Sequence, residues 1–188
     1  MPFDLWAFPP QLPKGLHSSL GFSGDAMLTA ETVRKMLNYD PDTGVFYWLK
    51  RRNKVQIGDV AGSKDYRGYI RIRLYKKRYM AHRLAWLFVH GNWPVLEIDH
   101  INGICDDNRL SNLREATRAQ NTQNKRRQQN NTSGFKGVHF NVREKRFQAD
   151  IKARGTALRL GFYDTAEEAY RAYCEAAHQL HGEFARLK

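Results

Sequence analysis

Cysteine is scarce in this chain, since only Cys105 and Cys174 occur among 188 residues and they lie far apart in the sequence. Their number excludes a scaffold of several disulfides and a zinc site made of four cysteines, and it favours a reducing cell interior. Long apolar runs are also lacking, because none approaches the 18 residues that suggest a membrane-spanning helix. Of the six prolines, four lie within the first 27 residues.

Basic residues, in contrast, are abundant. Lys and Arg number 31 against 19 Asp and Glu, which gives a net charge of +12. This excess predicts a polyanionic partner, either nucleic acid or an anionic membrane. A membrane surface is disfavoured because no basic helix with a matching broad apolar face is evident. The net charge is −1 over residues 1–27, +7 over 28–121 and +6 over 122–188, so two separate segments are basic.

Composition divides the chain into four parts. Residues 1–27 show no clear periodicity and lack the basic start and apolar run of a signal peptide, so we expect a poorly ordered leader. A natural product that begins at Met27 is the alternative. Residues 122–132 contain almost nothing apolar. They predict a basic, polar linker between one domain over 28–121 and a second domain over 133–188.

Short periodic segments alternate along the chain and predict an α+β fold. Helices are expected over 29–38, with Thr29 as the N-cap, and over 81–91. The run 113–121 is interpreted as a third helix, and the amphipathic run 164–182 as a fourth, capped by Asp164 or Thr165. Residues 76–78 are expected to form a turn. Strands are expected over 45–49, 68–75, 96–101, 137–143, 146–152 and 156–163.

Asp99, His100, Asn112 and Asn121 form the most informative pattern. Asn112 lies twelve positions after His100, and Asn121 lies nine after Asn112. Phosphodiester hydrolysis needs a base that takes a proton from water and a divalent cation that neutralises charge on the scissile phosphate. His suits the first role at neutral pH, whereas carboxylate and amide oxygens suit Mg²⁺ or Mn²⁺.

The segment EIDHINGICDDNRLSNLREATRAQNTQNK resembles the ββα-metal core of HNH endonucleases, in the phage and intron-associated branch that has Asn in place of the last His. With the upstream run YRGYIRIRLYKKRYMAHRLAWLFVHGNWP, the resemblance covers roughly residues 38–125. It implies that His100 is the general base and that Asp99 and Asn121 hold one divalent metal, Mg²⁺ or Mn²⁺. Asn112 would brace the loop and orient His100 through backbone or ring contacts.

The resemblance also implies a phage or mobile-element enzyme of homing type, located inside a bacterial or phage-infected cell. One active site per chain would cut one strand at a time. His82 either contacts a phosphate or packs at its helix start. Asn108 is expected to fix the loop rather than bind metal. Arg71 and Arg73 lie on the outer face of the strand over 68–75 and are expected to contact DNA.

The C-terminal part resembles a second family. GFKGVHF, RFQADIK, LRLGFYDTAEEAYRAY and AAHQLHGEFARL are similar to the plant ethylene-response-factor (Apetala-two type) DNA-binding domain, over residues 133–188. The resemblance implies a three-stranded antiparallel sheet that lies in the major groove and is supported by one helix. The side chains expected to face DNA are Lys136, His139, Asn141, Arg143, Lys152 and Arg159.

Alternation along these strands places apolar residues on the opposite face, among them Val138, Phe140, Val142, Leu158 and Leu160. The sequence departs from the plant pattern, because Phe147 stands where Trp is common, and His139 and Asn141 stand where Arg is common. Base preference therefore does not transfer from that family.

Together these features predict a metal-dependent DNA endonuclease that acts on double-stranded DNA, with no membrane and no obligatory protein partner. A catalytically silent, sequence-specific DNA-binding protein is the alternative. A single-strand or RNA-binding protein is a third class, permitted by the interleaved Arg, Tyr and Trp of 66–86.

Overall fold

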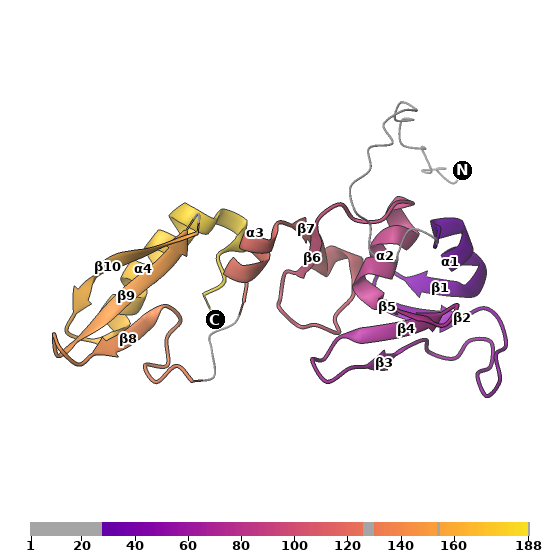
Figure 1. Cartoon of the computed structure of the whole chain (residues 1–188), viewed down its shortest axis with the longest axis horizontal. Coiled ribbons are helices and arrows are strands. Elements are labelled where there is room, and N and C mark those ends of the chain that lie inside the picture. Colours follow the sequence, from indigo (N-terminus) through magenta and orange to yellow (C-terminus); the bar gives the residue numbers. More distant parts are fainter. Residues whose placement is uncertain (1–27, 126–129, 154, 188) are drawn as a thin grey trace, which may run out of the picture.

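The computed structural model describes residues 28–125, 130–153 and 155–187, and these form two α+β units joined near helix α3 (Figure 1). The α+β fold class is therefore confirmed. The first unit contains α1 (Ala30–Met36), β1 (Leu37–Asp40), β2 (Val45–Trp48), β3 (Ser63–Lys64), β4 (Ile70–Leu74), β5 (Lys77–Met80), α2 (Ala81–His90), β6 (Glu97–His100), β7 (Leu113–Ala116) and α3 (Arg118–Gln123). The second contains β8 (Val138–Asn141), β9 (Arg146–Ala153), β10 (Thr156–Tyr163) and α4 (Ala166–His181).

The core of the first unit lies between helices α1 and α2 and two small antiparallel sheets, β1–β2 and β3–β4–β5. Thr29 caps α1 as predicted, because its hydroxyl accepts a hydrogen bond from the Thr32 amide. The alternation of β4 is also confirmed, since Ile72 and Leu74 are buried while Arg73 is exposed. Truncating a core side chain such as Ile72 to alanine would cost about 2–5 kcal/mol.

Three local predictions in this unit were wrong. The helix expected over 29–38 ends at Met36, because Leu37 begins strand β1, which pairs antiparallel with β2. Residues 76–78 do not form a turn, since the turn lies at Tyr75 and Lys76, both at positive φ, and Lys77 begins strand β5. The run 113–121 is not one helix: Leu113–Ala116 forms β7, which pairs antiparallel with β6, and α3 starts only at Arg118. The physical reason is that pairing with β6 buries Leu113 and Ala116, and this outweighs the helix propensity of the local sequence.

Thr117 is the N-cap of helix α3: its hydroxyl accepts from the Gln120 amide while the Gln120 side chain accepts from the Thr117 amide. This capping box stabilises the helix start immediately after β7. The helix continues to Gln123, and the side chain of Asn124 is buried. Gln123 and Asn124 fall in the segment 122–132 that was expected to be a linker. Residues 126–129 of that segment lie outside the described residues, and so does the expected leader 1–27.

In the second unit the strands lie in the order β10-β9-β8, and α4 packs on one face of this sheet. Val138, Ala149 and Ile151 are buried beneath the helix. Thr165 rather than Asp164 caps α4, with Glu168 completing a second capping box, and the helix ends before Gly182.

The apolar face of this sheet was predicted too broadly. Phe140, Val142 and Leu158 are all exposed, and a register irregularity between Arg159 and Gly161 interrupts the alternation of β10. Among the described residues, no helix has both the length and the apolar character needed to span a membrane.

Candidate functional site

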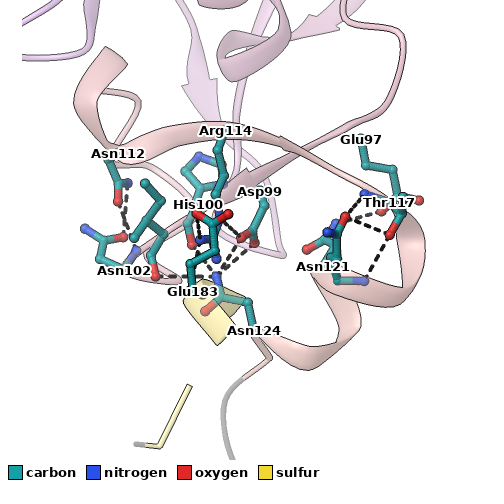
Figure 2. A network of polar contacts seen from close by, with 12 residues as sticks. Glu97, Asp99, His100, Asn102, Asn112, Arg114, Thr117, Asn121, Asn124 and Glu183 are labelled. Carbon is teal, nitrogen blue, oxygen red and sulfur yellow. Dashed lines mark hydrogen bonds and ion pairs between the residues drawn. The ribbon is translucent and has the colours of Figure 1, made fainter. Parts of the chain in front are cut away.

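Strand β6 ends in Asp99 and His100, which are 3% and 5% exposed and line an open cavity of about 310 Å³. Asn121 and Asn124 at the end of α3 and Tyr69 before β4 line the same cavity. The fold therefore brings together side chains from the loop before β4, from strand β6 and from the end of helix α3, of which Tyr69 and Asn124 are 55 positions apart in the chain. Figure 2 shows Asp99, His100, Asn121 and Asn124 from close by.

The ring of His100 is held by Asn108 in the loop between β6 and β7. Its Nε2 lies 3.1 Å from Asn108 Oδ1, and the Asn108 amide donates to the Asp106 carbonyl at 3.4 Å, which orients the oxygen toward the ring. Because an oxygen only accepts, it favours the tautomer with a proton on Nε2. The lone pair on Nδ1 is then the basic position. Burial lowers the pKa of His100, and the Asn108 hydrogen bond and the Asp99 charge oppose this.

His82 on α2 packs against this ring. The two ring centroids are 5.0 Å apart in an edge-on arrangement, and His82 is 7% exposed. Burial, with smaller contributions from His100 and Arg83, lowers the pKa of His82 to about 3. Of the two roles left open by the sequence, packing at the helix start is the one that this burial fits.

The Asp99 carboxylate is held from two sides (Figure 2). Arg114 of β7, directly opposite Asp99 in the strand register, donates from Nε to Oδ2 at 3.0 Å. Asn124 donates from Nδ2 to both carboxylate oxygens at 2.9 Å and to the His100 carbonyl at 2.8 Å. These donors fix the plane of the carboxylate beside the cavity.

Asn112 makes hydrogen bonds that hold the loop between β6 and β7 together. Its Oδ1 accepts from the Asn102 amide at 2.9 Å, and its Nδ2 donates to the Asp107 carbonyl at 2.7 Å. Its carbonyl accepts from the Ile101 amide, next to His100. The hydrogen bond to the His100 ring comes from Asn108 rather than Asn112.

Asn121 lines the cavity with Asp99, although no hydrogen bond links the two side chains. Its Nδ2 donates to Glu97 Oε2 at 2.7 Å (Figure 2), which leaves Oδ1 as the atom suited to a metal ligand. Within residues 28–125, 130–153 and 155–187 there is no cluster of three His, Cys, Asp or Glu side chains that could hold a metal. One carboxylate and one amide oxygen nevertheless suit Mg²⁺ or Mn²⁺, because such ions keep several waters and take phosphate oxygens as ligands.

Several residues expected to contact DNA have protein partners, and Arg71 and Lys136 are the most strongly held. Arg71 is half-buried and its Nε lies 2.7 Å from Asp65 Oδ2. Lys136 donates to the carbonyls of Gln123 at 2.7 Å and Arg186 at 3.0 Å, and burial lowers its pKa to about 8. Arg73 is exposed on β4.

The remaining residues expected to contact DNA lie in the second unit. Asn141 is half-buried and donates to Gln148 Oε1 across β8 and β9 at 2.8 Å, and His139 lies 3.6 Å from Asp150. Apart from Asn141 and Lys136, the residues of this unit that were expected to contact DNA are exposed: His139, Arg143, Lys152 and Arg159.

Three contacts at the site were not predicted from the sequence. Asn108 contacts the His100 ring, and Arg114 and Asn124 contact the Asp99 carboxylate. Asn124 follows Asn121 by three positions, a helical spacing that could have suggested a shared face. Arg114 could have been found only by assigning β7 as a strand, because its contact arises from the β6–β7 register.

Comparisons with known proteins relate the region of this site to a known family. A family model described as HNH endonuclease matches residues 79–123. Protein 3.8 of Escherichia phage T7 is 31% identical over 118 residues, which cover 61% of this chain and 97% of that protein. The uncharacterized HNH endonuclease L560 of Acanthamoeba polyphaga mimivirus is 30% identical over 156 residues, covering 77% of this chain and 81% of the relative.

A solved structure on DNA binding and cleavage by the HNH homing endonuclease I-HmuI is similar over 75% of this chain and 76% of its own, with 22% identity and a TM-score of 0.39.

Proposed function

The chain belongs to the HNH endonuclease family, and on that premise we propose that it hydrolyses double-stranded DNA with His100 as the general base. The observation that carries the proposal is the contact between His100 Nε2 and Asn108 Oδ1 at 3.1 Å. This contact favours a basic Nδ1, and burial lowers the pKa of the ring, so His100 is neutral at pH 7 and able to take a proton from water.

Asp99 and Asn121 would hold one divalent ion, Mg²⁺ or Mn²⁺. Both residues line the cavity beside His100, and their oxygens are the hard ligands that these ions prefer. A bound ion would neutralise charge that develops on the scissile phosphate and on the leaving oxygen. Arg114 and Asn124 keep the Asp99 carboxylate in place, and Asn112 keeps the loop that carries Asn108 in place.

The second unit would act as a DNA-targeting module of the Apetala-two type. Support comes from its sequence resemblance and from the exposed side chains of His139, Arg143, Lys152 and Arg159. Arg can pair with guanine, and Asn141 could pair with adenine, whereas Lys more often meets phosphate. Arg73 would add a DNA contact on the first unit.

One site in each chain supports strand nicking, so a duplex break would need two copies or two events. A phage or mobile-element role of homing type is part of the proposal, in keeping with the viral origin of both relatives.

Nicking of plasmid DNA tests whether His100 is the general base. Supercoiled plasmid incubated with the protein and Mg²⁺ or Mn²⁺ should give open circles before any linear product, and EDTA should stop the reaction. His100→Ala should lose cutting and keep DNA binding, because only the base is removed. His178→Ala is the matched control, since this histidine is exposed on α4 and does not line the cavity.

Normal cutting by His100→Ala would refute the assignment of the base. Binding without cutting by the unaltered protein, in both metals, would instead support the catalytically silent alternative.

A second test asks which of Asn121 and Asn124 is a metal ligand and which only holds Asp99 in place. Asn121→Ala should raise the half-saturating Mn²⁺ concentration for nicking, whereas Asn124→Ala should mainly lower stability, by about 1–3 kcal/mol, because it leaves buried Asp99 with fewer donors. Metal titrations of nicking and urea unfolding of both variants measure this. If only Asn124→Ala raises the metal requirement, Asn124 is the ligand.

A further inference from the structure

The C-terminal end of the chain returns to the catalytic unit and contacts Arg114. Arg114 Nη1 donates to the Glu183 carbonyl at 3.0 Å and lies 3.3 Å from Glu183 Oε2 (Figure 2). The Arg114 guanidinium also lies 3.6 Å from the centroid of the Phe184 ring, which is 6% exposed. A cation over an aromatic face is stabilised most when both are shielded from water, as here.

Two further contacts hold the same segment against the catalytic unit. The Lys136 ammonium joins the Gln123 carbonyl on α3 to the Arg186 carbonyl, at 2.7 and 3.0 Å. The Arg186 guanidinium lies so close to Gly103 in the β6–β7 loop that a Cβ on Gly103 would overlap it. The end of the second unit is therefore docked at three points on the first unit.

Arg114 connects this docked segment to Asp99. Its Nε bonds the Asp99 carboxylate and its Nη1 bonds Glu183, and its side chain is only 13% exposed. A guanidinium is a rigid planar fork, so fixing one edge of it fixes the direction of the other edge. The Phe184 ring and the Glu183 carbonyl thus set the plane in which Arg114 meets Asp99.

We propose that residues 183–187 are a positioning element of the nuclease site, which acts through Arg114 on the Asp99 carboxylate. The inference rests on the proposed function of Asp99. It makes the second unit part of the catalytic machinery as well as a DNA grip. The Glu183 carboxylate itself contributes little, because it is 76% exposed and such surface ion pairs are weak, so the carbonyl and the ring are the effective groups.

Substitutions at Phe184 in the full chain test this. Phe184→Leu keeps an apolar side chain and removes the aromatic face, whereas Phe184→Tyr keeps the face. Phe147→Leu is the matched control, since this half-buried ring packs in the core of the second unit beside Phe140. The readouts are kcat and KM for plasmid nicking, and Mn²⁺ binding to the DNA-free protein by calorimetry.

We expect Phe184→Leu to lower kcat and Mn²⁺ affinity on the order of tenfold with KM unchanged, in the range found when groups supporting a metal ligand are removed. Phe184→Tyr should retain both values, and Phe147→Leu should retain kcat. Arg114→Lys keeps the charge without the fork and should reproduce the loss. Combined with Phe184→Leu, it should give no additional loss, because both act through one guanidinium.

If the unaltered protein nicks DNA and Phe184→Leu matches it in kcat and Mn²⁺ affinity, the inference is overturned while the proposed function stands. Equal losses in Phe147→Leu, or additive losses in the double variant, would overturn it too. Should Phe184→Leu fail to fold, Phe184→Met removes the aromatic face while keeping an apolar side chain of similar length, and it supplies the same comparison. Absence of nicking by the unaltered protein in either metal would instead refute the proposed function.

Discussion

At the scale of the residue, His82 and His100 have different roles although their rings pack edge to face. His100 has a hydrogen-bond partner for Nε2 and lines the cavity. His82 is packed behind it, with a buried Nδ1 that has no hydrogen-bond partner within the described part of the chain. A charged His82 would therefore be both desolvated and repelled by a protonated His100.

This arrangement predicts an acid-sensitive fold. The pKa of His82 is about 3 when folded, against about 6.5 in an unfolded chain. Between these values the unfolded chain binds the extra proton, so the free energy of unfolding falls as pH drops below about 6.5, by up to ~1.4 kcal/mol per pH unit. His100, whose pKa is also lowered, adds a loss of the same sign.

Urea unfolding at pH 7, 6, 5 and 4 measures this loss. His82→Phe should show a shallower pH dependence than the unaltered protein, whereas exposed His178→Gln should leave the dependence unchanged. An identical slope in His82→Phe would mean that His82 does not stay neutral in the folded protein.

At the scale of the element, the β1–β2 hairpin supports the loop that carries Asn108. Tyr39 donates to the Asn108 carbonyl at 2.7 Å, and the Leu110 amide donates to the Pro41 carbonyl at 3.0 Å. Gly44, at φ +74°, lies so close that a Cβ there would be 2.4 Å from the backbone of Asn108 and Arg109. The hairpin and the loop can approach only because this residue is glycine.

Gly44→Ala should therefore push the loop away and weaken the hold of Asn108 on His100. We expect a loss of more than 1 kcal/mol in unfolding free energy, since the strained φ and the overlap add together, and a loss of nicking activity. Gly58→Ala is the matched control, because Gly58 has a similar φ of +89° and nothing within 4 Å of its Cβ position. Equal effects of the two changes would show that only backbone strain matters at Gly44.

The elements also show what the sequence could predict. The alternation of strand β4 and the helical periodicity and N-cap of α4 are clear in the sequence, and both elements were predicted correctly. Asp99, His100 and Asn112 were predicted from their spacing and from the resemblance to the HNH core, and their catalytic roles stay predictions. Strand β7 has four residues, LREA, without alternation, so only its pairing with β6 defines it. The contacts of Arg114 depend on that pairing, and those of Asn124 on where α3 ends.

At the scale of the whole molecule, the two basic segments form separate folded units whose ends meet beside the site. The cationic side chains divide into two groups. Arg114, Lys136 and Arg186 are used within the protein, in the contacts that join the units. Arg143, Lys152 and Arg159 are exposed on the second unit and remain available to a polyanion. Net charge alone does not distinguish these groups.

This division predicts how binding depends on salt. Each phosphate contact contributes about 0.9 to the slope of log affinity against log salt, so replacing Arg143, Lys152 and Arg159 together by Gln should lower that slope by up to roughly 2.7. Fluorescence anisotropy with a labelled duplex between 50 and 300 mM salt measures it. Lys35→Gln with Arg171→Gln is the control, because both side chains are exposed away from the predicted DNA face.

The triple variant should also raise KM for nicking and leave kcat unchanged. The reason is that the docked C-terminal segment keeps its contacts to Arg114, so the catalytic site stays intact while the DNA grip weakens. An unchanged salt slope would show that this face does not meet phosphate. In that case the exposed cations of the second unit serve solubility, and DNA binding rests on the first unit, where Arg73 and its neighbours lie.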